Sequence, residues 1–175
     1  MKVVKYSWEQ LEGAALELAR QITQSEWMPD YIVGINRGGI IPANLLSQYL
    51  GIPMKVLHVS LRDFPHELEH NTWMACDALG ITDDSLASVG LRKNILIVDD
   101  INDSGATLDW IKADWKQLCL PNNPEWKNVW NKNVKFAVIY DNAASNALVD
   151  FCVEEFDKRE EDIWIDFPWE NYWRK

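Results

Sequence analysis

Hydrophobic and polar residues along this chain change their spacing several times, and these changes predict the order of strands and helices. Short runs rich in Val, Ile and Leu are bounded by turn-forming residues, as in strands buried within a parallel sheet. Between them, apolar residues recur at helical intervals, which predicts amphipathic helices. The pattern places strands at 3–6, 31–35, 54–60, 93–99, 134–140 and 151–156, and helices at 8–22, 40–50 and 105–118.

Strands and helices alternate without an internal repeat or a linker, which favours a single α/β domain with a parallel sheet. Capping residues mark two of the helix boundaries. Ser7 and Gln10 fit a capping box at the start of the first helix. Gly51 and Pro53 follow the apolar stretch that ends near Leu50, and this order is typical of a helix end.

The run from Ile95 to Thr107 carries the strongest functional signal in the sequence. A buried strand leads into Asp99 and Asp100, and a short polar turn then opens a helix. Unpaired N–H groups at a helix start lie at the positive end of its dipole, so the turn suits a phosphate. The two carboxylates suit ribose hydroxyls and a hydrated Mg²⁺. The predicted ligand is a sugar phosphate, with its phosphate bound by Asp103, Ser104, Gly105, Ala106 and Thr107.

This run resembles the phosphoribosyl-diphosphate (PRPP) signature of the type I phosphoribosyltransferases. Further segments resemble the bacterial xanthine-guanine members of that family, and they occur in the same order as in those members. These segments are Ser7–Leu11, Gly34–Gly39, Leu148–Asp150 and Ile163–Trp169. The resemblance covers most of the chain, with gaps at 61–90 and 119–133.

The resemblance implies the type I phosphoribosyltransferase fold for the single domain 1–175. This fold is a mostly parallel sheet flanked by helices, with a flexible flap at about 61–90 and a small base-binding C-terminal hood at about 151–175. The implied activity is purine salvage: PRPP and guanine, xanthine or hypoxanthine would give a nucleoside 5′-monophosphate and pyrophosphate, with Mg²⁺ as cofactor. A homodimer or homotetramer is also implied. Two alternatives remain open, namely a PRPP- or nucleotide-sensing regulator and a phosphoribosyltransferase for another base.

The resemblance also implies roles for single residues. Asp99 and Asp100 would hold the ribose and Mg²⁺, and Arg37, Gly38 and Gly39 would grip the pyrophosphate. Glycines allow backbone N–H groups to approach an anion closely, and arginine adds a forked set of donors. The proton transfer at N7 of the base is assigned to Asp103, since a positioned carboxylate can supply it. Asp103 also suits a helix cap, and the two roles are compatible.

The base site is expected at the C-terminus. There Trp164 would stack on the purine, and the Ile165 backbone and Asp166 would lie near its edge. One departure from the family concerns a lysine that donates to the 6-oxo group, because Asn142 stands at its position. An uncharged amide makes a weaker hydrogen bond than an ammonium group, so a weaker preference for 6-oxopurines is expected.

Two other motifs are rejected. The residues from Asp100 onward mimic the start of an EF-hand loop, but the twelfth position is Ile111 and a strand precedes the loop. The segment His66–His70 matches the HExxH pattern of zinc proteases. A charged Glu69 lies inside that pattern and no third ligand is evident, so a solvated helix face is the favoured interpretation.

Composition narrows the possible partners. The formal net charge is −10, which argues against a nucleic-acid partner because such partners require a basic face. No apolar run has the length of a membrane helix and no signal peptide is evident, so no membrane association is expected. The odd number and wide spacing of Cys76, Cys119 and Cys152 predict no disulfide or zinc framework, which favours a cytoplasmic location.

Overall fold

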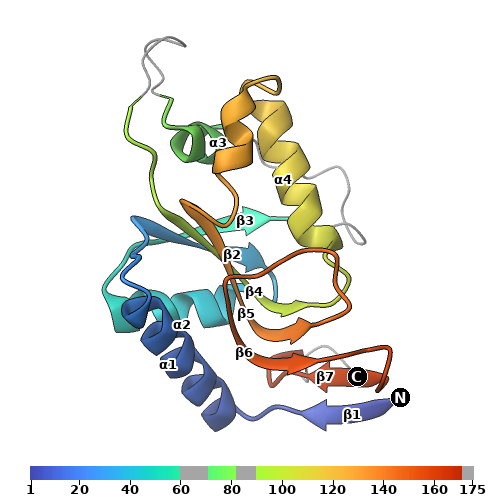
Figure 1. The fold of residues 1–175 in the computed structure, drawn as a ribbon. Coiled ribbons are helices and arrows are strands. Elements are labelled where there is room, and N and C mark those ends of the chain that lie inside the picture. Colours follow the sequence, from blue (N-terminus) through green and yellow to red (C-terminus); the bar gives the residue numbers. More distant parts are fainter. Residues whose placement is uncertain (60–70, 82–89, 171–175) are drawn as a thin grey trace.

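A computed structural model describes residues 1–59, 71–81 and 90–170 of the chain (Figure 1). Every strand and helix expected from the hydrophobic pattern is present, and three further elements, α3, η1 and β7, are added. The order of elements is β1 (Lys2–Lys5), α1 (Trp8–Gln24), β2 (Tyr31–Asn36), α2 (Ile40–Leu50), β3 (Met54–His58), α3 (Thr72–Leu79), β4 (Ile95–Asn102), α4 (Ala106–Leu118), the 3-10 helix η1 (Pro124–Asn128), β5 (Val134–Asn142), β6 (Phe151–Phe156) and β7 (Ile163–Asp166).

A five-stranded sheet in the order β3-β2-β4-β5-β6 forms the centre of the molecule, and all of its neighbouring strands are parallel. Helices α1 and α2 cover one face, and α3 and α4 cover the other (Figure 1). Successive residues of a strand point to opposite faces. Accordingly Leu96 packs under α1 and α2, whereas Ile97 packs under α3 and α4. The prediction of a mostly parallel sheet flanked by helices is therefore confirmed.

A second, two-stranded sheet pairs β1 with β7 in parallel. Tyr6, Phe167 and Trp169 pack together beneath it and join it to α1. The hood predicted at about 151–175 is thus divided, because its first part, β6, lies in the main sheet beside β5. The second part, β7, forms the small sheet with the N-terminal strand, and residues 171–175 lie outside the described residues.

The capping residues act as predicted. The Ser7 hydroxyl accepts a hydrogen bond from the Gln10 backbone N–H at 3.1 Å, and the Gln10 side chain accepts one from the Ser7 N–H at 2.9 Å. Gly51 ends α2 in the left-handed conformation, with φ of 67°. No helix in the described part of the chain is long and apolar enough to cross a membrane.

The range 61–90, predicted to be a flap, contains a core helix. Helix α3 buries Met74, Ala75, Ala78 and Leu79 against the sheet and α4. The predicted flap allowed for some local structure, and α3 is such a structure at residues 72–79; the sequence analysis did not place it because its eight residues are too short to show a clear period. Residues 60–70, with the His66–His70 pattern, and 82–89 lie outside the described residues.

The segment 119–133, unmatched by the resemblance, is a packed aromatic unit. Trp126 stacks on Trp130 with ring centroids 5.7 Å apart, and Trp130 stacks on Phe136 of β5 at 6.1 Å. The Trp126 indole N–H donates to the Cys119 carbonyl at 3.0 Å. These tryptophans fill the core. The same region brings the free thiols of Cys76 and Cys119 within 3.1 Å of each other.

Candidate active site

A cavity of about 410 Å³ opens at the carboxyl ends of the central strands. Open parallel sheets bind ligands at this edge. Its wall combines the end of β4, the start of α4, the chain after β6 and the small sheet. The lining residues are Val59, Asp99, Asp100, Ile101, Asn102, Asp103, Ser104, Gly105, Ala106, Thr107, Leu108, Phe156, Lys158, Ile163, Trp164, Ile165, Phe167 and Glu170.

The carboxylates of Asp99 and Asp100 lie near the end of β4 and are partly buried. Burial raises the pKa of Asp99 well above its ordinary value, and the neighbouring charge of Asp100 raises it further. Burial also raises the pKa of Asp100. Such a pair is stabilised by a bound cation. Two carboxylates beside a substrate phosphate are the donor set that Mg²⁺ commonly uses. The described residues contain no group of three or more His, Cys, Asp or Glu that could hold a metal ion, so a cation at this pair would need further oxygen ligands from a bound molecule or from water.

The loop Arg37–Gly39 packs directly against this acidic pair. A Cβ atom on Gly38 would lie 2.1 Å from Oδ2 of Asp100, and one on Gly39 would lie 2.2 Å from the carbonyl oxygen of Val98. Only glycine allows this approach, which brings together two motifs far apart in the sequence. The peptide bond Asn36–Arg37 is cis. Arg37 is exposed and, like both glycines, lies beside the lining residues rather than among them.

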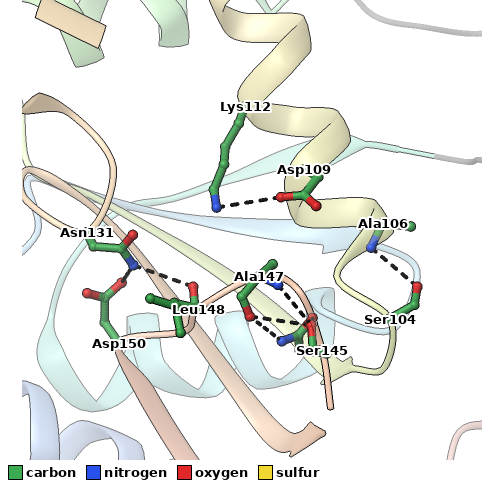
Figure 2. A network of polar contacts seen from close by, with 10 residues as sticks. Ser104, Ala106, Asp109, Lys112, Asn131, Ser145, Ala147, Leu148 and Asp150 are labelled. Atoms are coloured by element: carbon green, nitrogen blue, oxygen red, sulfur yellow. Dashed lines mark hydrogen bonds and ion pairs between the residues drawn. The ribbon is translucent and has the colours of Figure 1, made fainter. Parts of the chain in front are cut away.

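The turn 103–107, called the phosphate loop below after the role expected from its sequence, leads from β4 into α4. Gly105 precedes the helix with φ of 85°. The N–H of Ala106 donates to the Ser104 hydroxyl at 3.3 Å (Figure 2). Within the described residues, the N–H groups of Gly105, Thr107 and Leu108 donate to no other group of the chain. The loop therefore presents backbone donors to the cavity at the positive end of the α4 dipole, which suits an anion.

Replacing Gly105 by Ala is expected to damage this loop. The new Cβ would lie 2.8 Å from the Ala147 N atom and 2.9 Å from the Ser145 hydroxyl, and the positive φ adds roughly 1–2 kcal/mol of strain. Thermal unfolding should occur at a lower temperature, and an anion should bind the loop more weakly. Gly13→Ala is the matched control, because Gly13 is exposed on α1 and a Cβ atom added there would meet nothing within 4 Å. That change should raise the melting temperature, and equal effects at both glycines would contradict this account of the loop.

Asn102, which lines the cavity at the end of β4, connects this strand to the segment 141–147. Its buried amide donates to Oδ1 of Asp141 at 2.7 Å and to the Ala147 carbonyl at 3.0 Å. Its oxygen accepts from the Ser145 hydroxyl at 3.1 Å. Figure 2 shows Ser145 and Ala147 beside the turn that carries Ser104. An aliphatic residue could not make these three bonds, so Asn102 fixes the chain 141–147 against the phosphate loop.

Asp103 lines the cavity and forms two side-chain contacts. Its Oδ2 atom pairs with the Lys158 ammonium at 2.8 Å. Asn142 donates to the Asp103 carbonyl at 2.8 Å and to its Oδ1 atom at 3.4 Å. Asn142 itself is buried and lies behind the lining residues. The structure thus brings Asn142 to Asp103 but not to the cavity wall, where the sequence analysis expected it. Lys158 was missed because it lies 55 residues from Asp103 in sequence.

Of the three base-binding residues predicted on β7, two line the cavity and one does not. Trp164, which is 40% exposed, and Ile165 line the cavity from β7. Asp166 is 8% exposed and lies outside the lining set. Phe156 and Glu170 line the cavity without having been predicted. The exposed indole of Trp164 offers a flat face suited to an aromatic ring.

Comparison with known proteins agrees with this geometry. The model of the phosphoribosyl transferase domain family matches residues 6–174. A xanthine-guanine phosphoribosyltransferase from Idiomarina loihiensis is 27% identical, over 94% of this chain and 84% of that protein. A hypoxanthine-guanine phosphoribosyltransferase from Schizosaccharomyces pombe is 26% identical, over 94% and 87%. The crystal structure of a purine phosphoribosyltransferase from Pyrococcus horikoshii matches with a TM-score of 0.65 and 28% identity, over 97% and 95% of the two chains.

Proposed function

Because the chain belongs to the phosphoribosyl transferase domain family, whose enzymes transfer a pentosyl group, we propose that it acts on a purine base. The proposed reaction joins PRPP to guanine, xanthine or hypoxanthine and yields a nucleoside 5′-monophosphate and pyrophosphate for nucleotide salvage. The names of the similar proteins support a purine substrate. The observation that carries the proposal is the presence, in one cavity, of loop N–H groups that bond to no other described group and of two partly buried carboxylates with raised pKa.

In the proposed complex, the 5′-phosphate of PRPP binds the backbone donors of the phosphate loop, and its ribose hydroxyls bind Asp99 and Asp100. The pyrophosphate faces Arg37–Gly39, which packs against the same carboxylates. As the bond from C1 of the ribose to pyrophosphate breaks, positive charge develops on the ribose. The nearby carboxylates then stabilise that charge electrostatically.

The base is placed between the small sheet and the phosphate loop. Trp164 stacks on its ring, and a ring nitrogen attacks C1 of the ribose. Asp103 accepts or shares the proton at N7 as the new bond forms, a role worth about 10²- to 10⁴-fold in rate. Asp99 and Asp100 would hold Mg²⁺ together with oxygens of PRPP, which supplies charge neutralisation for the departing pyrophosphate.

Pyrophosphate release tests the proposal. The protein is incubated with Mg²⁺, PRPP and one base at a time: guanine, xanthine, hypoxanthine, adenine or uracil. Release with at least one 6-oxopurine is expected. Release with uracil alone would replace the proposal by a phosphoribosyltransferase for a pyrimidine. Binding of PRPP without release for any base would replace it by the nucleotide-sensing regulator.

A further inference from the structure

We propose that Lys158 is the residue that selects a 6-oxopurine, acting as a pair with Asp103 and positioned by Asn142. This inference rests on the proposed function and names a determinant of its base specificity. Sequence position alone gives Lys158 no role, because it follows β6 in a polar segment that also contains Asp157 and Arg159.

The charge distribution of the cavity singles out Lys158. Among the described residues that line it, Asp99, Asp100, Asp103 and Glu170 are acidic, and Lys158 alone is basic. The Lys158 side chain is 43% exposed and that of Asp103 is 42% exposed, so the pair faces the opening rather than being enclosed. An ammonium group has three donors, and its contact with Asp103 at 2.8 Å uses one of them. Within the described ranges, the other two donors bond to no further group, so a ligand can accept from them.

Asn142 holds the two partners in place from behind. Its amide nitrogen donates to the Asp103 carbonyl at 2.8 Å, and its oxygen accepts from the Lys158 backbone N–H at 3.2 Å. The same oxygen accepts from the N–H of Ala144 at 3.0 Å. Because the amide of this buried side chain is occupied on both sides, it cannot also contact a base. Asn142 is therefore a positioning residue, and its partner Lys158 supplies the charged donor.

The pair matches one edge of a purine. N7 and the substituent at C6 are neighbours on that edge. In a 6-oxopurine with a proton on N7, the edge presents a donor beside an acceptor. Asp103 would accept from N7–H while Lys158 donates to the 6-oxo oxygen. Adenine presents an amino donor at C6. The ammonium group of Lys158 would then face another donor, so the pair disfavours a 6-aminopurine.

Kinetics with hypoxanthine and adenine test this inference, because the two bases differ at C6. Lys158→Met keeps most of the side-chain length and removes the charge. Loss of a charged hydrogen bond should lower kcat/KM for hypoxanthine by about 10- to 100-fold. The kcat/KM for adenine should not fall, so the hypoxanthine-to-adenine ratio of kcat/KM should decrease by at least about tenfold. Lys158→Arg should restore part of that ratio.

Arg159→Met is the matched control. Arg159 pairs with Asp157 and is 71% exposed, and it does not line the cavity. This variant should keep the wild-type ratio, and circular dichroism should show that both variants fold. Suppose that the wild-type enzyme releases pyrophosphate with hypoxanthine and that Lys158→Met has the same ratio as the wild type. This result would overturn the role of Lys158 and leave the proposed function intact. A wild-type protein that releases pyrophosphate with none of the bases overturns the proposed function instead.

Discussion

Replacing Asp103 by Asn is expected to lower kcat by about 10²- to 10⁴-fold, because an amide cannot take up the proton at N7 of the base. Asn has the same shape and can still accept a hydrogen bond from Asn142. The backbone of the phosphate loop should therefore stay in place, and the KM for PRPP should change little. Pyrophosphate release at varied PRPP and saturating hypoxanthine measures both constants.

Asp109→Asn is the control for this change. Asp109 lies in the first turn of α4, where it pairs with Lys112 at 3.8 Å on the exposed side of the helix (Figure 2). The Asp109→Asn substitution removes one negative charge, as Asp103→Asn does, but six residues further along the chain and at a residue that does not line the cavity. An ion pair this long with one exposed partner contributes little to stability, and Asp109 does not line the cavity, so kcat should be close to that of the wild type. If the Asp103→Asn enzyme has the kcat of the wild type, Asp103 does not take part in the proton transfer.

Replacing Asp100 by Asn should weaken the enzyme and strengthen the fold. Burial raises the folded-state pKa of Asp100. Its protonated carboxyl group therefore contributes stability that is fully present below the unfolded-state pKa of about 3.9. This contribution to the free energy of unfolding is lost as pH rises through the folded-state pKa. At pH 8 the Asn variant should therefore melt about 2–4 °C higher than the wild type, if the gain is about 1 kcal/mol. Turnover should fall by about 10²-fold, because the site loses one carboxylate for the ribose and Mg²⁺.

Thermal unfolding at pH 8 and pH 4, each with and without Mg²⁺ and PRPP, separates these effects. The advantage of the variant should shrink at pH 4, where the wild-type carboxylate is more fully protonated. Added Mg²⁺ and PRPP should raise the melting temperature of the wild type more than that of the variant, since a ligand stabilises the state that binds it. A variant that melts below the wild type at pH 8 would contradict the account of this buried pair.

Much of the fold was predictable because its signals are local. Buried strands such as β2 are continuous apolar runs, and Ser7 and Gly51 mark helix ends through their own chemistry. The turn 103–107 that opens α4 was predictable for the same reason, since its residues are contiguous. Helix α3 was missed because it is short, and β7 was not separated from the aromatic C-terminus because it pairs with β1, at the other end of the chain.

The side of the cavity near Asn142 and Lys158 was the least predictable part, because its contacts join segments that are far apart in the sequence. Asn142 follows the buried strand β5, and nothing local shows that its amide is already bonded to Asp103 and to the chain at Lys158. The contacts of Asn102 could not be predicted either, since its hydrogen-bond partners come from the distant segment 141–147. The contacts of such residues can be identified only once the arrangement of the strands in the sheet is known.

A crystal structure of the protein with PRPP and Mg²⁺ tests the central claim most directly. The claim predicts the 5′-phosphate on the N–H groups of Gly105 and Thr107, with the ribose hydroxyls on Asp99 and Asp100. An empty cavity at saturating PRPP, or a phosphate bound away from residues 103–107, would contradict it.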